Sequence, residues 1–326
     1  MENACSIILA AGAGTRMFTK KPKVLLKVLF KPMLKWVVDS VFRSEIYDTC
    51  IVCGYGHEKV EKYLKDNNVE ARIVIQNERK GTAHAVYVAK NYLEQNIEKD
   101  VIILAGDGPF IDVETIKSSY RLHKKNDNDA TVITAKIENP FGYGRIVRDP
   151  NTKSIIAIVE QKDATDEVKI IKEVNSGTYW FKVKSLLEVL PQINNYNNQS
   201  EFYLPDAIKL LLNNARRVGT FFVKDQNIIL GANTKEQLNK LNEIAINKRL
   251  CELMHQGVDI PLKEGIIVSE EATFGEDVKI LPGTVICGKS KIGSNCTIGP
   301  GVYIENCTIR DNTSINCMNL KNKVLD

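Results

Sequence analysis

A glycine-rich segment close to the N-terminus carries the residue types best suited to binding an anion. Residues 6–11 form an apolar run, and Gly12 and Gly14 follow it. Glycine has no Cβ, so backbone N–H groups at such positions can approach phosphate oxygens closely. Arg16 and Lys23 then add positive charge that binds phosphate strongly. The spacing predicts a strand followed by a loop that holds a polyphosphate.

Two better-known phosphate-binding motifs are excluded in this segment. No Gly-Lys-Ser/Thr follows the glycines, and Met17 occupies the third glycine position of the dinucleotide fingerprint. A Gly-x-Gly pair alone favours a tight turn with surface cations. The longer strings LAAGAGTRM and PKVLLKV resemble the signature of the sugar-1-phosphate nucleotidyltransferases, in which the loop and the later lysine wrap a nucleoside triphosphate.

Two oxygen-bearing side chains further along the chain are candidate metal ligands. Asp107 lies in LAGDGP at the end of an apolar run, next to glycines that leave room for a ligand. Asn233 lies in ILGAN, which we interpret as the end of a late strand. Mg²⁺ needs few protein oxygens, because it keeps waters and phosphate oxygens in its shell. Taken alone, Asp107 fits a helix N-cap equally well, and Asn233 fits a cap for the helix that follows better than a metal ligand.

The elements that must position these residues alternate between strand and helix up to about residue 230. Short apolar runs alternate with segments of helical periodicity, which predicts a mostly parallel sheet covered on both faces. Ligands bind beyond the carboxyl ends of such strands, and Gln76 and Asp107 each directly follow an apolar run. The predicted helices cover residues 33–43, 57–66, 82–93 and 113–123. After residue 131 the pattern is β-rich and predicts one wall of a cleft, and the polar segment 194–204 predicts a mobile loop.

The C-terminal part is an internal repeat with a period of six residues. One apolar residue anchors each unit, at Val268, Phe274, Ile280, Ile286, Ile292, Ile298 and Ile304, and after a shortened unit at Ile309 and Ile315. The position four residues after each anchor takes small or β-branched residues, as a narrow prism interior requires. This pattern predicts a left-handed parallel β-helix of about three coils, followed by a polar end.

The fold class is therefore α/β: a mostly parallel sheet, which the resemblance identifies as a Rossmann-like nucleotidyltransferase domain, followed by a short left-handed parallel β-helix of hexapeptide repeats. We expect boundaries at 1–232 for the first domain, 233–257 for a connecting helix and 258–326 for the β-helix. Each coil buries little by itself. By resemblance to other hexapeptide-repeat proteins, we expect a homotrimer formed through the prism faces.

Composition excludes several other classes of protein. The chain has 326 residues and a formal net charge of only +4 with scattered cations, which argues against nucleic-acid binding. No apolar run is long enough to span a membrane, and Glu2 precedes the N-terminal run where a signal peptide would be basic. We therefore expect a cytoplasmic protein.

The eight cysteines do not suggest a disulfide framework, and Cys50 and Cys53 fall on opposite faces of one predicted strand. His57 and His84 are interpreted as capping or packing residues.

A series of short strings identifies a closer resemblance. In chain order they are LAAGAGTRM, PKVL, GYGH, Gln76, GTAHAV, GDGP, FGYGRI, IVEQKDAT, EVNSG and GAN. As a set, over residues 4 to 320, they resemble the bifunctional N-acetylglucosamine-1-phosphate uridylyltransferase family. The resemblance implies Mg²⁺-dependent uridylyl transfer from UTP to N-acetylglucosamine 1-phosphate, for the synthesis of a peptidoglycan precursor.

The resemblance also implies a role for each matching residue. The nucleotide loop would comprise Leu9, Ala10, Ala11, Gly12, Gly14, Arg16 and Lys23. The uracil readers would be Gln76, Gly81 and Thr82, and Gly106 and Asp107 would contact ribose and metal. Gly144, Glu160 and Asn175 would bind the sugar, and Asp107 and Asn233 would hold Mg²⁺. The catalytic residues implied are Arg16, Lys23 and Asp107.

Two departures from the family pattern bear on the function. The usual Tyr-Gly-Asp is Ala105-Gly106-Asp107 here, followed by Gly108, which predicts a wider pocket. The later coils that build the acetyl-CoA site of the family are missing, so we expect no acetyltransferase activity. Two alternatives remain open: a nucleotidyltransferase for another sugar 1-phosphate, such as glucose 1-phosphate, and a non-catalytic regulatory or scaffold homologue. The presence of Arg16, Lys23 and Asp107 favours an enzyme over the scaffold.

Overall fold

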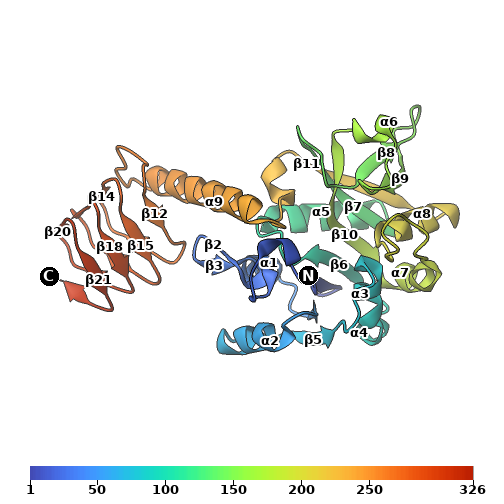
Figure 1. The fold of residues 1–326 in the computed structure, drawn as a ribbon, viewed down its shortest axis with the longest axis horizontal. Helices are drawn as coiled ribbons and strands as arrows, with labels where there is room; N and C mark the ends of the chain where they lie inside the picture. Colours follow the sequence, from blue (N-terminus) through green and yellow to red (C-terminus); the bar gives the residue numbers. More distant parts are fainter. Residues whose placement is uncertain (326) are drawn as a thin grey trace. The chain divides into compact units, whose positions relative to one another are not determined.

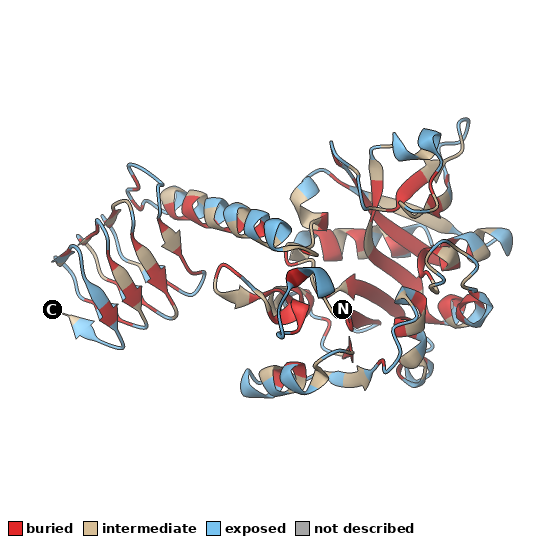
Figure 2. Ribbon diagram, viewed as in Figure 1, coloured by how far each residue is buried: buried red, intermediate tan, exposed pale blue. Residues whose placement is uncertain are grey.

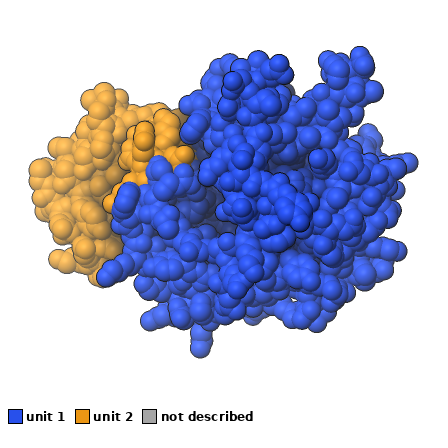
Figure 3. All heavy atoms as spheres, turned by 45° about the vertical axis from the view of Figure 1, so that its right-hand side comes forward, with its two compact units in different colours: residues 1–26, 32–234 blue, residues 27–31, 235–326 orange. Residues whose placement is uncertain are grey.

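The computed structural model describes residues 1–325, which divide into two compact units. The first unit comprises residues 1–26 and 32–234, and the second comprises residues 27–31 and 235–326 (Figure 3). The short segment 27–31 therefore belongs with the C-terminal part of the chain, an association that no local pattern in the sequence indicated.

The first unit is built on a mostly parallel sheet with helices against it (Figure 1). Its strands are β1 (Ala4–Ala10), β4 (Thr49–Cys53), β5 (Arg72–Ile75), β6 (Asp100–Ala105), β7 (Ala130–Lys136), β8 (Arg145–Arg148), β9 (Ile155–Val159), β10 (Glu173–Lys182) and β11 (Val218–Val223). The sheet order is β11-β7-β10-β6-β1-β4-β5, and β8 joins β10 to β9. Only β10 runs antiparallel to its neighbours in the main order. The predicted α/β architecture is thereby confirmed.

The helices predicted over 33–43, 57–66 and 113–123 are confirmed, whereas three further helices lie after residue 131, where we expected a β-rich pattern. The helices of this unit are α1 (Met33–Arg43), α2 (His57–Asp66), α3 (Thr82–Val88), α4 (Lys90–Gln95), α5 (Val113–Lys125), α6 (Asp166–Lys169), α7 (Val183–Val189) and α8 (Pro205–Asn213). Short 3-10 turns are η1 (Thr15–Met17), η2 (Lys23–Leu25), η3 (Leu190–Gln192) and η4 (Gln226–Ile229). The single helix predicted over 82–93 is wrong, because Ala89 leaves the helical conformation and separates α3 from α4.

Apolar clusters cover both faces of the sheet, which explains why its strands read as continuous apolar runs (Figure 2). Cys50 belongs to one cluster and Cys53 to the other, so the two thiols face opposite sides of β4. Both are buried and free, and burial raises the pKa of each thiol to about 12. They are core residues, as the alternation of the strand predicts.

The predicted placement of Asn233 at the end of a strand is wrong, and Asn175 and Glu160 reach the site in different ways. Asn233 does not end a strand: β11 stops at Val223, and Asn233 lies in the loop between η4 and the following helix. Asn175 lies inside β10, where the strand advances four residues to Tyr179 while β7 advances two. Such a bulge re-aims side chains, so Asn175 reaches the cleft from within a strand. Glu160 does follow β9, but β9 pairs only with β8, at the margin of the sheet.

The polar segment 194–204, which we expected to be a mobile loop, is held by several hydrogen bonds. Phe202 N–H donates to the carbonyl of Lys80 at 2.7 Å, and Phe202 O accepts from the N–H of Ala83 at 2.9 Å. Asn198 contacts both Lys162 and Asp163. The segment is tied on both sides to loops that follow strands β5 and β9.

The second unit contains the β-helix, whose three parallel sheets hold four, four and three strands. These strands are β12 (Ile267–Val268), β13 (Thr273–Phe274), β14 (Lys279–Ile280), β15 (Val285–Cys287), β16 (Lys291–Ile292), β17 (Thr297–Ile298), β18 (Tyr303–Glu305), β19 (Thr308–Ile309), β20 (Ser314–Ile315), β21 (Asn319–Lys321) and β22 (Val324–Leu325). Every predicted anchor is buried except the half-buried Phe274. Three complete coils form, as predicted, but the polar end is not outside the β-helix, because β21 and β22 add two strands of a fourth coil. Ile304 pairs with Leu320 and Ile309 with Leu325, so the coil continues after the six-residue spacing has ended.

One long helix, α9 (Lys235–His255), and the pair β2 (Lys27–Val28) and β3 (Lys31–Pro32) complete the chain. Arg249 of α9 is buried and donates to the carbonyls of Ser269 at 3.2 Å and Ala272 at 2.8 Å, which ties the helix to the first coil. Asn242 accepts from Leu29 N–H at 2.9 Å and so ties the segment 27–31 to α9. Among residues 1–325, no helix combines the length and the apolar character that a membrane crossing requires.

Candidate active site

A cleft of about 590 Å³ opens at the carboxyl ends of the parallel strands of the first unit. Most predicted site residues line it: Leu9, Ala11, Gly12, Lys23, Gln76, Gly81, Thr82, Asp107, Glu160 and Asn175. Ala10, Gly14, Arg16, Gly106, Gly144 and Asn233 are not among its lining residues. The tertiary structure therefore gathers residues that are up to 166 positions apart, from Leu9 to Asn175, around one space.

Lys23 joins the two candidate metal ligands. Its Nζ donates to Oδ2 of Asp107 in a short ion pair and to Oδ1 of Asn233 at 2.9 Å. The Lys23 side chain is only 11% exposed, so little water competes for these bonds. The carboxylate and the amide oxygen thus converge on one point at the floor of the cleft. The sequence suggested the pair as ligands but contained no sign that Lys23 would lie between them.

The glycine loop makes room for Lys23. Gly14 has a φ of +61°, and a Cβ added there would lie 2.8 Å from Cβ of Lys23. Gly106 N–H donates to Leu9 O at 2.9 Å and fastens the end of β6 to the end of β1. Arg16 lies in η1 and is exposed, outside the cavity. The loop therefore places one cation at the floor of the cleft and a second at the surface.

Gln76 forms the wall that we predict to read the base. It is 5% exposed and follows β5, and its Nε2 lies 3.2 Å from Gly81 O and 2.9 Å from Nδ1 of His84. Gly81 has a φ of +107°, and a Cβ there would lie 2.4 Å from the carbonyl oxygen of Phe202. Only glycine fits where these two loops touch. The interpretation of His84 as a packing residue missed its contact with Gln76.

The predicted sugar residues form the opposite end of the cleft. Asn175 Nδ2 donates to the hydroxyl of Tyr179 at 2.5 Å, and its Oδ1 accepts from Gly177 N–H at 3.0 Å. Gly144 does not line the cavity but allows Glu160 to enter it, because a Cβ at Gly144 would lie 3.0 Å from Oε1 of Glu160.

The carboxyl group of Glu160 has an altered acidity. Burial raises its pKa to about 7, and the negative charges of Asp163 and Asp206 act in the same direction. Arg145 opposes this shift only in part. Burial also raises the pKa of the Tyr179 hydroxyl, which keeps that group a neutral donor. The sugar end of the cleft therefore holds an acid that changes charge near neutral pH.

Several lining residues were not assigned to the site from the sequence, among them Arg79, Gly177, Tyr179 and Glu201. Arg79 lies three residues after Gln76, and its positive charge at a strand-end loop was an available signal. Gly177 and Tyr179 enter through the bulge of β10, which has no clear local signature. Glu201 comes from the segment expected to be a mobile loop, and only its bonds to other loops bring it here.

Nothing among residues 1–325 groups three or more histidine, cysteine, aspartate or glutamate side chains in the manner of a zinc or calcium site. The available donors are the carboxylate of Asp107 and the amide oxygen of Asn233, both already bonded to Lys23. A small set of oxygen ligands suits Mg²⁺, which completes its octahedron with water and substrate oxygens. The donor set thus fits the predicted cofactor.

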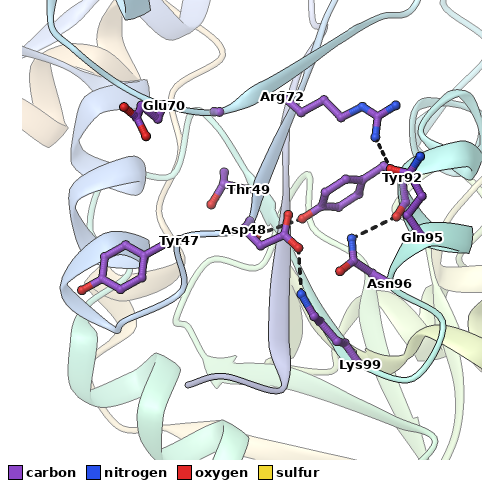
Figure 4. A pocket seen from close by; sticks show the side chains of 10 residues that line it. Tyr47, Asp48, Thr49, Glu70, Arg72, Tyr92, Gln95, Asn96 and Lys99 are labelled. Carbon is purple, nitrogen blue, oxygen red and sulfur yellow. Dashed lines mark hydrogen bonds and ion pairs between the residues drawn. The ribbon is translucent and has the colours of Figure 1, made fainter.

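A second cavity of about 520 Å³ lies at the other edge of the sheet, where β4 and β5 begin (Figure 4). Three of its four charged side chains are already bonded: Lys99 pairs with Asp48 at 2.8 Å, and Arg72 donates to Gln95 at 2.5 Å. None of the predicted site residues lines it. It lies at the amino ends of the strands, so it is not the site that the sheet topology indicates.

Comparison with known proteins establishes the class. A family model described as nucleotidyl transferase matches residues 5–231, and one described as bacterial transferase hexapeptide (six repeats) matches residues 271–306. The solved structure of a UDP-glucose pyrophosphorylase complexed with UDP-glucose superposes with a TM-score of 0.62 at 19% identity, covering 74% of this chain and 98% of that chain. That likeness shows a shared fold. The protein is a nucleotidyltransferase that carries hexapeptide repeats.

Curated relatives narrow this class to one family. The "Bifunctional protein GlmU" of Clostridioides difficile (strain 630) is 40% identical over 314 residues, which is 96% of this chain and 67% of the relative. The protein of the same name from Geobacillus sp. (strain WCH70) is 41% identical over 318 residues, 97% of this chain and 68% of the relative. The chain belongs to the GlmU family of sugar-1-phosphate nucleotidyltransferases and spans about two thirds of the length of these relatives.

Proposed function

We propose that this protein transfers the uridylyl group of UTP to N-acetylglucosamine 1-phosphate, giving UDP-N-acetylglucosamine and pyrophosphate. The observation that carries the proposal is the composition of the cleft at the carboxyl edge of the sheet. Lys23 and Asp107 offer a site for phosphate and metal, Gln76 offers an amide to a base, and Glu160 and Asn175 offer partners for sugar hydroxyls. Family membership supports the reaction class.

In the proposed reaction a phosphate oxygen of the sugar phosphate forms a bond to the α-phosphorus of UTP. The bond from that phosphorus to the bridging oxygen breaks, and pyrophosphate leaves with the electron pair. No covalent intermediate with the protein is needed, so the residues act by positioning and by charge. Lys23 supplies a desolvated positive charge on the phosphoryl groups. Arg16, which is exposed on η1, meets the departing pyrophosphate.

We assign Asp107 and Asn233 as the protein ligands of Mg²⁺, because their oxygens already converge on one cation, the Lys23 ammonium. When bound, the metal would neutralise the charge of the triphosphate. Lys23 retains a role of its own, since it holds both ligand side chains in one orientation. Gly12 keeps the wall of the cleft beside Lys23 free of a side chain.

A pyrophosphate-release assay that crosses UTP, CTP, dTTP and ATP with several sugar 1-phosphates tests the proposal. We expect turnover with UTP and N-acetylglucosamine 1-phosphate to exceed every other pair. Preference for glucose 1-phosphate would support the second candidate, a different sugar specificity, which the small Ala105 in the cleft lining favours by widening the pocket. The other small residue of this segment, Gly108, is not among the lining residues. No release with any pair would support the non-catalytic alternative and overturn the proposal.

We further propose that these 326 residues do not catalyse acetyl transfer, although relatives carry the name bifunctional. The support is the share of the relatives that the chain covers, 67 to 69%. Incubation with acetyl-CoA and glucosamine 1-phosphate should release no coenzyme A above background. Release that depends on both substrates would contradict this part of the proposal.

A further inference from the structure

Two contacts determine which atom of the Gln76 amide faces the cleft. Its Nε2 lies 3.2 Å from the carbonyl oxygen of Gly81 and 2.9 Å from Nδ1 of His84. The Gly81 oxygen also accepts the N–H of Ala85 at 3.1 Å, within the first turn of α3. A carbonyl oxygen only accepts, so the atom of Gln76 beside it must be the NH₂ group.

The same geometry determines the state of the His84 ring. One hydrogen of the Gln76 NH₂ group goes to Gly81 O, and the other points at Nδ1 of His84. Nδ1 must therefore accept, which requires a neutral imidazole with its proton on Nε2. Within residues 1–325 no group donates to Oε1 of Gln76, and Gln76 lines the cleft. An entering base thus meets a hydrogen-bond acceptor.

We propose that His84 is a positioning residue that holds the Gln76 amide in the orientation that selects uracil over cytosine. This inference rests on the proposed use of UTP. Uracil has an N–H at ring position 3, which donates to Oε1, whereas cytosine has a bare nitrogen there, which repels it. If the amide flipped, its NH₂ group would face the base, and the selection would be reversed.

His84 acts through Gln76, because it does not line the cleft. Its ring borders a separate small cavity of about 220 Å³, together with Tyr87 and Phe202. Gly81 alone is a weaker restraint, since its contact with Nε2 is longer by 0.3 Å than the contact with His84. Without His84, the two orientations of the amide would differ less in energy.

Three variants separate this role from a packing role. His84→Phe keeps a ring but removes the acceptor, and His84→Asn restores an acceptor through its side-chain oxygen. Tyr87→Phe is the matched control, one turn further along α3 and on the same small cavity. Thermal melting of each variant checks that it folds.

The measurement is kcat/KM for UTP and for CTP with N-acetylglucosamine 1-phosphate. We expect His84→Phe to lower the ratio of kcat/KM for UTP to kcat/KM for CTP about tenfold, which is the size expected when one hydrogen-bond preference is lost. The change should appear in KM rather than in kcat. His84→Asn and Tyr87→Phe should keep the wild-type ratio. A wild-type preference for UTP that His84→Phe leaves unchanged would overturn the inference while the proposed function stands.

A second readout does not depend on the substrate. Nitrogen-15 NMR of the histidine rings at mildly alkaline pH, without nucleotide, reports which ring nitrogen carries the proton, and His84→Phe identifies the signals. We expect an unprotonated Nδ1 and a protonated Nε2 for His84. A proton on Nδ1 would overturn the inference whichever nucleotide the enzyme uses. A failure to use UTP would overturn the proposed function and, with it, the selection of uracil, but not the orientation of the Gln76 amide by His84.

Discussion

Lys23 is the side chain on which the phosphate end of the cleft depends. Its ammonium group has two oxygen partners, Asp107 and Asn233, and both partners are the candidate metal ligands. A buried cation needs such partners, because an uncompensated charge in a dry site is costly. The arrangement keeps the carboxylate and the amide oxygen in place before any ligand enters, which is the preorganisation that charge-stabilised catalysis uses.

The carboxylate of Asp107 should be essential for Mg²⁺-dependent turnover. Asp107→Asn keeps the shape of the side chain and removes its charge, and we expect kcat to fall about 100-fold in the pyrophosphate assay. Asp112→Asn is the control, because Asp112 only caps α5 by accepting from Thr115 N–H at 2.7 Å, a role that asparagine also fills. Equal activity of the two variants would refute the site assignment.

Glu160 should make folding stability depend on pH. Its pKa is raised from 4.5 to about 7 in the folded state, so between these values the folded protein binds the extra proton. The contribution of Glu160 to stability is therefore fully present below about pH 4.5 and is lost as the pH rises through 7. Glu160→Gln removes this titration and should be stabilising by at most about 3 kcal/mol at pH 8, with a smaller gain at pH 5.

Urea denaturation of wild type and Glu160→Gln at pH 5 and pH 8 measures the difference. Glu98→Gln, at an exposed position, controls for the loss of a carboxylate. A stability gain in Glu160→Gln that is the same at both pH values would show that burial does not shift the acidity of this group.

At the scale of elements, the site is made by the ends of strands and by the loops that touch there. β1, β5 and β6 deliver Gly12, Gln76 and Asp107 to one edge, since parallel strands end on the same side. The antiparallel β10 contributes differently, through the bulge that turns Asn175 into the cleft. The contact between Gly81 and the backbone of Phe202 closes the base end.

That contact predicts different costs for two glycine substitutions. Gly81→Ala and Gly142→Ala both place a side chain at positive φ, but only Gly81 meets another backbone, since nothing lies within 4 Å of a Cβ at Gly142. In Gly142→Ala, backbone strain alone should lower the free energy of unfolding by on the order of 1 kcal/mol. In Gly81→Ala, overpacking should lower the free energy of unfolding by roughly a further 1–3 kcal/mol.

The melting temperatures and the KM for the nucleotide together test this prediction. Gly81→Ala should also raise KM, because the Gly81 carbonyl is a partner of Gln76. Equal losses of stability in the two variants would mean that the loop around Phe202 shifts to accommodate the added methyl group without any loss of stability.

At the scale of the whole molecule, the chain consists of a nucleotidyltransferase unit and a unit in which α9, the segment 27–31 and the β-helix pack together. Arg249 is central to the second unit. Burial lowers the pKa of its guanidinium, but the group stays paired with two carbonyls of the first coil. The end of a β-helix needs a cap, because its last coil has a neighbour on one side only. The buried Arg249 acts as this cap for the first coil.

Arg249→Met should destabilise the second unit by roughly 3 kcal/mol, because two buried carbonyls lose charged donors. The neighbouring Lys248→Met, at an exposed position of the same helix, should have little effect. Scanning calorimetry of the full chain measures both. If the two variants unfold alike, the tie between α9 and the coil contributes no stability.

We propose that the chain assembles as a trimer through its β-helix, as expected from the hexapeptide repeats. Light scattering coupled to gel filtration should then give a mass about three times 36.6 kDa. A mass equal to that of one chain, at micromolar concentration, would reject the proposal.

Local patterns in the sequence were sufficient for most elements. The period of six residues predicts the β-helix, because each short strand places one side chain inside a narrow prism. Strand and helix periodicity predict α1 and α2 to the residue, because apolar spacing and burial coincide there. The pattern was followed through one shortened unit at Ile309 but not to Leu320 and Leu325, where two successive units have five residues and the surrounding residues are polar.

The sequence by itself determined the inventory of the site: a glycine loop with cations, an aspartate after a strand, and amide and carboxylate side chains downstream. Only the tertiary structure decided how they interact. It placed Lys23 between Asp107 and Asn233, set His84 against Gln76 and brought Glu201 into the cleft. Local spacing sets the conformation of a segment, whereas contacts between distant residues depend on how the strands are ordered and where their loops meet.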